Sequence, residues 1–157
     1  MAAPKSVVKV NKNGVQYTSN VDAAQYYIHE LTRAALRDVG KFVKKMWRSA
    51  YYEHFTKRTG DAGRALSYKV ISSKTTTAPR IEMGLEHSRK GKNVDGFYAF
   101  FQEFGTSKTP RLGLLSNTVE DNIAKIVEIE SKYLSGLEDE AAALAMVNEG
   151  EYADEDE

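Results

Sequence analysis

The residue types that most often carry catalysis or bind metals are sparse in this sequence. Cysteine is absent, which excludes disulfides, thiolate nucleophiles and cysteine zinc sites. The three histidines, His29, His54 and His87, include no pair with the i,i+4 spacing of a helical zinc site. Neither a Gly-x-x-x-x-Gly-Lys-Ser/Thr phosphate loop nor a Gly-x-Ser-x-Gly hydrolase turn occurs. We therefore expect no metal and no cofactor.

Carboxylate pairs are the remaining candidates for acid–base chemistry. Glu82 with Glu86, or Asp61 with Glu103, could serve as acid and base. Nothing in their spacing distinguishes them from ordinary surface carboxylates. The sequence therefore predicts a protein that is not an enzyme.

Charge is distributed unevenly, although the formal net charge of the 157 residues is zero. No Lys or Arg follows Lys132, and residues 138–157 carry nine acidic side chains. Residues 1–137 hold 22 basic and 13 acidic residues, a net charge of +9. We expect a basic body with an acidic, solvated and flexible tail at 138–157, because blocks of like charge repel one another. Residues 141–147 could add a helical turn or two before the tail.

Binding to nucleic acid is the functional alternative that the basic body raises. The loop containing Arg89, Lys90 and Lys92 could contact a phosphate backbone without sequence preference. A solvated helix face is the simpler interpretation of the other cations, since no helix-turn-helix, ribbon or base-stacking motif accompanies them. The sequence has no apolar run of membrane-spanning length and no apolar stretch typical of a secretory signal at residues 1–8. We expect the chain to fold in the cytoplasm, unless it is incorporated into a larger assembly.

The N-terminal half predicts an arm followed by one long helix. Residues 1–19 suggest a hairpin around Asn13-Gly14, a favoured turn pair, or a flexible arm that orders on assembly. A helix of about 30 residues should begin at Val21, after a cap at Ser19-Asn20. Its predicted apolar stripe has members spaced three or four apart: Ala24, Ile28, Leu31, Ala35, Val39, Phe42, Met46 and Ala50. Its aromatic end should fill the core through Trp47, Tyr51, Tyr52 and Phe55.

The second half predicts a small sheet and a further helix. Residues 66–71 and 79–85 alternate in polarity and should pair as antiparallel strands. Residues 97–104 are dense in aromatics and could form a strand or a helix. Another helix should be capped by Ser116-Asn117, with an apolar stripe at Val119, Ile123, Ile126, Ile129 and Tyr133. The predicted fold class is α+β: a long N-terminal amphipathic helix packed on a small antiparallel sheet, with a second helix near the C-terminus.

Two motifs resemble a known family. Arg58-Thr59-Gly60 follows the long helix and precedes a strand, and Tyr98-Ala99 leads into Glu103-Phe104-Gly105-Thr106-Ser107-Lys108 and then Pro110. In order and spacing they resemble the gene-product-ten-like phage morphogenesis family, the tail-completion or neck proteins of tailed phages. Residues 20–137 would be the tail-completion-like domain. The family's Pro-Phe-Leu before the last helix is replaced by Leu112-Gly113-Leu114-Leu115, so Leu114 and Leu115 should take over its anchoring role.

The resemblance implies a structural virion protein at the head–tail joint, made in the host cytoplasm. Such a protein is expected to form a homo-oligomeric ring, by the family pattern a hexamer. Its expected partners are the head-completion stopper protein, the tail terminator and tail tube proteins, and DNA passing non-specifically through the channel. Arg89, Lys90 and Lys92 would then contact the DNA channel or a neighbouring subunit. The alternatives are a tail terminator, a minor capsid component or a non-specific DNA-binding protein.

The residues of the second motif suit a structural turn. We predict that Gly105 follows an aromatic strand and takes a positive φ, as glycine readily does. Thr106 and Ser107 should satisfy freed backbone amides with their hydroxyls. Glu103 is predicted to pair with Arg58, which would hold the turn against the end of the long helix.

Overall fold

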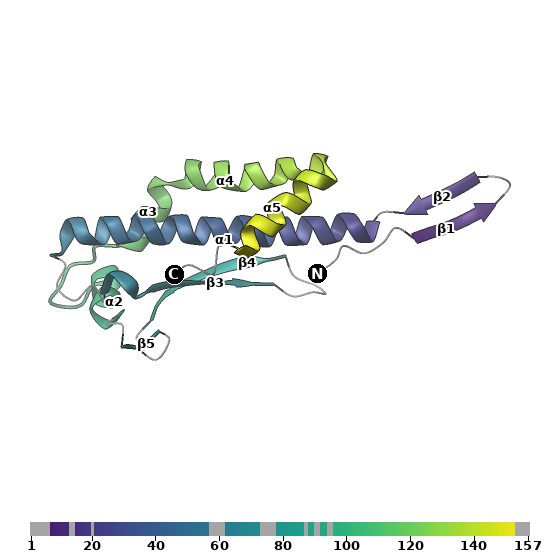
Figure 1. The fold of residues 1–157 in the computed structure, drawn as a ribbon. Helices are drawn as coiled ribbons and strands as arrows, with labels where there is room; N and C mark the ends of the chain where they lie inside the picture. Colours follow the sequence, from purple (N-terminus) through teal and green to yellow (C-terminus); the bar gives the residue numbers. More distant parts are fainter. Residues whose placement is uncertain are drawn as a thin grey trace.

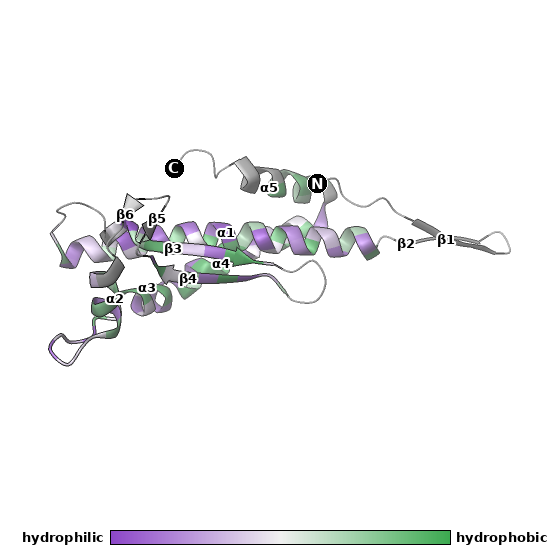
Figure 2. Cartoon of the chain, turned by 90° about the horizontal axis from the view of Figure 1, so that it is seen from below, coloured by the Kyte–Doolittle hydropathy of each residue, from purple (hydrophilic) through white to green (hydrophobic). Residues whose placement is uncertain are grey.

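The computed structural model is an elongated α+β molecule built along one long helix (Figure 1). It describes residues 7–12, 15–19, 21–56, 62–72, 78–86, 88–89, 92–93 and 96–152. Helix α1 (Val21–His54) lies between two layers. Strands β3 (Leu66–Ile71) and β4 (Arg80–Leu85) and helix α2 (Gly96–Phe104) lie on one side of it, and helix α4 (Ile123–Ser135) lies on the other. Helix α5 (Glu140–Tyr152) packs against a third face of α1, between these layers (Figures 1 and 2). The predicted fold class is confirmed.

Helix α1 has the predicted start and a wider buried surface than one stripe. Its central position buries side chains toward both layers, including Leu31, Ala34, Val43 and Trp47. The predicted stripe is wrong at its beginning, where Ala24 and Ile28 are exposed and Tyr27 is buried instead. The neighbouring elements, rather than the helical period alone, decide which face is covered at that end. The predicted cap at Ser19-Asn20 includes Asn20, which lies outside the described residues.

Strands β3 and β4 pair antiparallel, as the alternation predicted, from Leu66 opposite Leu85 to Ile71 opposite Arg80. The ribbon runs along α1 rather than across it (Figure 2). The two approach closely at Gly40, where an added Cβ would lie 2.5 Å from the ring of Tyr68 and 2.9 Å from Ile81. A glycine at the middle of α1 therefore lets the sheet lie directly on the helix.

The helical segment after Pro110 differs from the prediction in its start and its continuity. Helix α3 (Leu114–Asp121) begins two residues before the predicted Ser116-Asn117 cap, and α4 follows after Asn122. The Asn122 side chain donates to the carbonyl of Thr118 at 2.8 Å, and such local side-chain bonds compete with helical ones. The predicted stripe is confirmed at Tyr133, which is buried, and is wrong at Ile123, which is exposed.

The chain continues as packed structure beyond the expected tail boundary at residue 138. Helix α5 follows the short 3-10 helix η2 (Gly136–Glu138) and contains the helical turns expected at residues 141–147. Its Ala143 and Val147 are buried in a cluster with Leu31, Ala34 and Tyr133. Residues 138–147 therefore belong to the folded body, and residues 153–157 lie outside the described residues.

Two smaller ribbons complete the described chain. Strands β1 (Val7–Lys12) and β2 (Val15–Ser19) form the predicted N-terminal hairpin, with a register shift between Val8 and Val10. Its turn residues Asn13 and Gly14 lie outside the described residues. The hairpin projects beyond the N-terminal end of α1 (Figure 1). The segment expected as a basic loop contains paired two-residue strands, β5 (Ser88–Arg89) and β6 (Lys92–Asn93).

Two hydrophobic clusters hold these layers together. One lies at the N-terminal half of α1, where α4 and α5 pack on it. The other lies at its C-terminal end, where Trp47 and Tyr51 contact Leu66, Ala99 and Leu114. The predicted filling of the core by the aromatic end of α1 is confirmed, since Tyr52 and Phe55 also pack there. The 3-10 turn η1 (Ala62–Arg64) lies between α1 and β3 in the chain.

Candidate assembly surface

The most specific motif of the sequence forms the connection between α2 and α3. Residues 97–104, which the sequence left open as strand or helix, belong to helix α2. Glu103 lies in its last turn and is only 4% exposed. Its carboxylate accepts hydrogen bonds from the backbone N–H of Leu115 at 2.7 Å and of Ser116 at 3.2 Å, and from the Ser116 hydroxyl at 2.9 Å. Glu103 therefore caps the N-terminus of another helix.

The chemistry of a helix N-terminus explains this arrangement. The first backbone N–H groups of a helix have no partner within it and carry partial positive charge, which favours an anion there. The residue in the cap position of α3 is Gly113, which has no side chain to supply that anion. Both carboxylate oxygens of Glu103 take part, and hydrogen bonds to an ionised group are stronger than neutral ones. The cap thus locks the end of α2 to the start of α3.

The turn that follows Glu103 confirms two predicted features. Gly105 has a φ of 76°, and its N–H donates to the carbonyl of Phe101 at 2.8 Å, so it follows a helix and not the predicted strand. The Thr106 hydroxyl accepts from the N–H of Lys108 at 3.2 Å and of Thr109 at 3.0 Å. This is the role predicted for the motif's threonine. Thr106 also exchanges backbone hydrogen bonds with Thr109, which closes the turn.

The return of the chain to the core confirms the role expected of the two leucines. The N–H of Leu112 donates to the carbonyl of Gln102 at 2.8 Å, which brings the segment back along α2. Leu114 is buried in the cluster of Trp47 and Ala99, and Leu115 packs against it. The leucines therefore anchor the start of α3 in the core.

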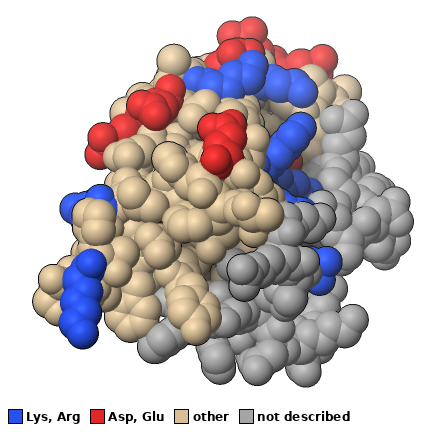
Figure 3. All heavy atoms as spheres, turned by 90° about the vertical axis from the view of Figure 1, so that its left-hand side faces the viewer, with Lys and Arg blue, Asp and Glu red and all other residues tan. Residues whose placement is uncertain are grey.

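The outward side of α2 carries an exposed aromatic surface. We call Tyr98, Phe100 and Phe104 the aromatic ridge; each exposes at least half of its surface. The rings of Phe100 and Phe104 are in contact, with centroids 4.7 Å apart and planes tilted by 47°. The ribbon of α2 includes green, hydrophobic segments in Figure 2, and the space-filling view from this end of the molecule shows uncharged surface with both basic and acidic side chains around it (Figure 3). Large exposed apolar surfaces are typical of interaction sites.

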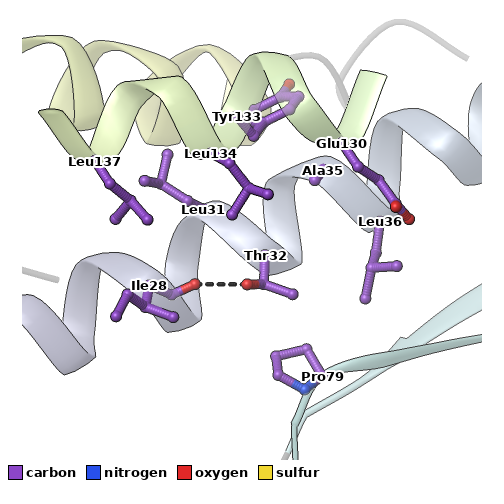
Figure 4. A pocket seen from close by; sticks show the side chains of 10 residues that line it. All are labelled: Ile28, Leu31, Thr32, Ala35, Leu36, Pro79, Glu130, Tyr133, Leu134 and Leu137. Carbon is purple, nitrogen blue, oxygen red and sulfur yellow. Dashed lines mark hydrogen bonds between the residues drawn. The ribbon is translucent and has the colours of Figure 1, made fainter. Parts of the chain in front are cut away.

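A second exposed apolar feature lies between α1 and α4. We call it the apolar groove, a hollow of about 270 Å³ with these lining residues: Ile28, Leu31, Thr32, Ala35, Leu36, Pro79, Glu130, Tyr133, Leu134 and Leu137. Leu134 and Leu137 point from the upper helical layer towards Leu31 and Ile28 on α1, and Pro79 lies across from them on the sheet side (Figure 4). Ile28, Leu134 and Leu137 are exposed. The groove is therefore open and lined mainly by aliphatic side chains.

The structure brings together only part of the predicted site. Tyr98, Glu103, Phe104, Gly105 and Thr106 lie on α2 and the turn after it. Residues 58–60, which include Arg58, Thr59 and Gly60, lie outside the described residues, so the predicted pair of Glu103 with Arg58 does too. Lys90 is also outside them, and Arg89 and Lys92 are described as backbone in β5 and β6 only.

The carboxylates considered for acid–base chemistry are not gathered into a site. Glu82 forms an exposed ion pair with Arg80 at 3.1 Å, and Glu103 is engaged by α3. Asp61 lies outside the described residues. Across the described ranges, no three His, Asp or Glu side chains gather as a metal site would require.

Sequence reasoning missed the apolar groove and the capping role of Glu103. The groove needs residues from α1, α4 and η2 and also Pro79, which precedes β4, and a pattern within one element does not relate them. One signal for it was present: the apolar Leu134 directly follows Tyr133 and does not fit its stripe. The cap could have been inferred from Gly113, which precedes helix α3 and has no side chain to accept hydrogen bonds from the first N–H groups of that helix.

The comparisons with known proteins add no relative. No family model, no curated protein and no solved structure matches the chain. In the part of the chain that the structure describes, no helix combines the length and the hydropathy needed to cross a membrane.

Proposed function

We propose that the chain is a structural part of the head–tail joint of a tailed phage, acting by assembly and not by catalysis. In this role it forms a ring, of six copies by the family pattern, between the head-completion stopper and the tail terminator and tube. The proposal starts from the resemblance of Tyr98-Ala99 and Glu103-Phe104-Gly105-Thr106 to the tail-completion family. The architecture of a long helix, a small sheet and later helices agrees with the order of elements in that family.

The engagement of Glu103 is the observation that carries the proposal. In the motif it is the residue best suited to acid–base work, yet it is 4% exposed and both its oxygens accept from the first turn of α3. A general base must reach a substrate proton by hydrogen bond, directly or through one water. Glu103 instead fixes the turn that carries Phe104 at the surface. The motif thus favours a structural role.

The N-terminal hairpin gives further support. A two-stranded hairpin alone is marginally stable in water, and β1–β2 projects away from the body in Figure 1. The unpaired edges of such strands are ready to pair with another chain. In the assembly, a neighbouring chain would pair with the edge of the hairpin and stabilise it. The net charge of +9 over residues 1–137 falls to +6 when the folded residues 138–147 are included, and it suits a ring around DNA, since cations attract phosphate without sequence preference.

The test is the position of the chain in purified phage particles. A chain with an N-terminal affinity tag, incorporated into particles and labelled with gold, should be found at the junction of head and tail by electron microscopy. An untagged chain treated with the same label is the control. Label spread over the capsid shell would contradict the proposal and favour a minor capsid component.

A further inference from the structure

The aromatic ridge and the apolar groove lie at opposite ends of the molecule. Ala99 of α2 packs beside Trp47 near the C-terminal end of α1, whereas Ile28 of the groove lies in its N-terminal half. The 19 residues between Ile28 and Trp47 correspond to roughly 28 Å along a helix. One copy therefore cannot bring its own ridge into its own groove, but two copies can.

The groove is large enough for a ring of the ridge. The ridge projects two neighbouring phenyl rings from α2, and Phe104 is the more exposed of the two phenylalanines. The groove has a volume of about 270 Å³ and aliphatic walls. An apolar cavity of about 150 Å³ holds a benzene molecule. The groove thus has room for one phenyl ring and its connecting carbon, the kind of anchor that dominates protein interfaces.

Charges beside the two surfaces have opposite signs. Lys108 and Arg111 are exposed in the turn after the ridge. Glu130 lines the groove, and the exposed Glu138 and Asp139 directly follow its Leu137. A ridge-to-ridge contact would oppose cations to cations, and a groove-to-groove contact would oppose acids to acids. The charges therefore favour contact between a ridge and a groove.

Arg80 is a cation next to the groove, and it is already matched. It follows Pro79 in the chain and forms an ion pair with Glu82 at 3.1 Å. The acids on the α4 side of the groove are therefore not neutralised by it.

We propose that the groove binds the aromatic ridge of a second copy of this chain, with Phe104 inserted between α1 and α4 and Lys108 facing Glu138. Because the two surfaces differ, the contact is head-to-tail, which leads to a closed ring or an open filament and not to a two-fold dimer. The ring form rests on the proposed function, whereas the contact itself can be tested on the purified protein.

Cysteine cross-linking tests the contact directly, because the natural chain contains no cysteine. K108C mixed with E138C should form a disulfide-linked pair under mild oxidation, since the two side chains would face each other across the contact while Phe104 stays in place as its anchor. The matched control is I123C, which is exposed on α4 but lies 15 positions before Glu138. The 12 positions from Ile123 to Ser135 at the end of α4 alone correspond to roughly 18 Å, beyond the reach of a disulfide.

The expected yield of the K108C–E138C pair exceeds that of the K108C–I123C pair about tenfold, because a disulfide requires its Cβ atoms to be about 4 Å apart. Equal yields, no pair at all, or mainly K108C–K108C pairs would overturn the proposal. Loss of the anchor gives a second test: F104A added to the K108C chain should lower the yield with E138C to that of the I123C control, and an unchanged yield would overturn the insertion of Phe104. If the disulfide pair does not form, the contact is contradicted, but the gold label should still be found at the junction of head and tail. If the label is found elsewhere, the proposed function is contradicted, but the disulfide pair should still form.

Discussion

Replacing Glu103 by alanine should lower the free energy of unfolding by about 3 kcal/mol, which is the cost of removing a charged acceptor from buried donors. The substitution deprives the N–H groups of Leu115 and Ser116 and the hydroxyl of Ser116 of their acceptor. Gly113 offers no replacement cap. Urea unfolding of the purified variant and the natural protein measures the difference.

Two further variants distinguish the effect of losing the helix cap from the effect of losing any carboxylate. E103Q keeps the size of the side chain and one carbonyl acceptor, so it should lose less stability than E103A. E120A removes an exposed carboxylate from α3 and should change the free energy of unfolding by less than about 0.5 kcal/mol. If E103A and E120A prove equally stable, Glu103 does not hold α2 to α3.

Replacing Gly105 by alanine should cost about 2 to 3 kcal/mol, because a left-handed backbone and a steric conflict act together. The φ of 76° is unfavourable for a residue with a Cβ, and the Cβ would lie 2.9 Å from the backbone nitrogen of Arg111 and 3.1 Å from the carbonyl oxygen of Thr109. Backbone atoms in a closed turn cannot move aside as a flexible side chain can. Thermal and urea unfolding should both record the loss.

The control for this substitution is G84A. Gly84 lies in β4 and has no atom within 4 Å of an added Cβ, and no left-handed φ constrains it. We expect G84A to match the natural protein or to be slightly more stable, since alanine restricts the unfolded chain more than glycine does. Equal losses in G105A and G84A would show that the turn after α2 tolerates a side chain.

Much of the fold could be predicted because its signals are local. The helical period over the run from Val21, with no internal proline, identified α1, and the alternation at residues 66–71 and 79–85 identified β3 and β4. The wrong predictions concern residues whose burial depends on elements that are distant in the sequence. Ile28 has the spacing of a core residue but lies where the covering helices leave a hollow, and Ala143 of the expected tail is buried because α5 packs on α1.

The candidate site could be predicted in its residues but not in its connections. The types Gly105 and Thr106 were sufficient to predict a turn with a positive φ and a hydroxyl acceptor. The partner of Glu103 was not predictable in the same way, because Leu115 lies 12 positions later and contributes only its backbone N–H. A side chain leaves a pattern in the sequence, whereas a backbone donor leaves none.

The most direct measurement of the central claim is electron microscopy of particles assembled without the chain. A phage with a stop codon in place of Trp47, grown in a non-suppressing host, should yield DNA-filled heads and complete tails that remain separate. The natural chain supplied from a plasmid should restore joined particles. Joined, infectious virions in normal numbers without the chain would contradict a role in head–tail joining.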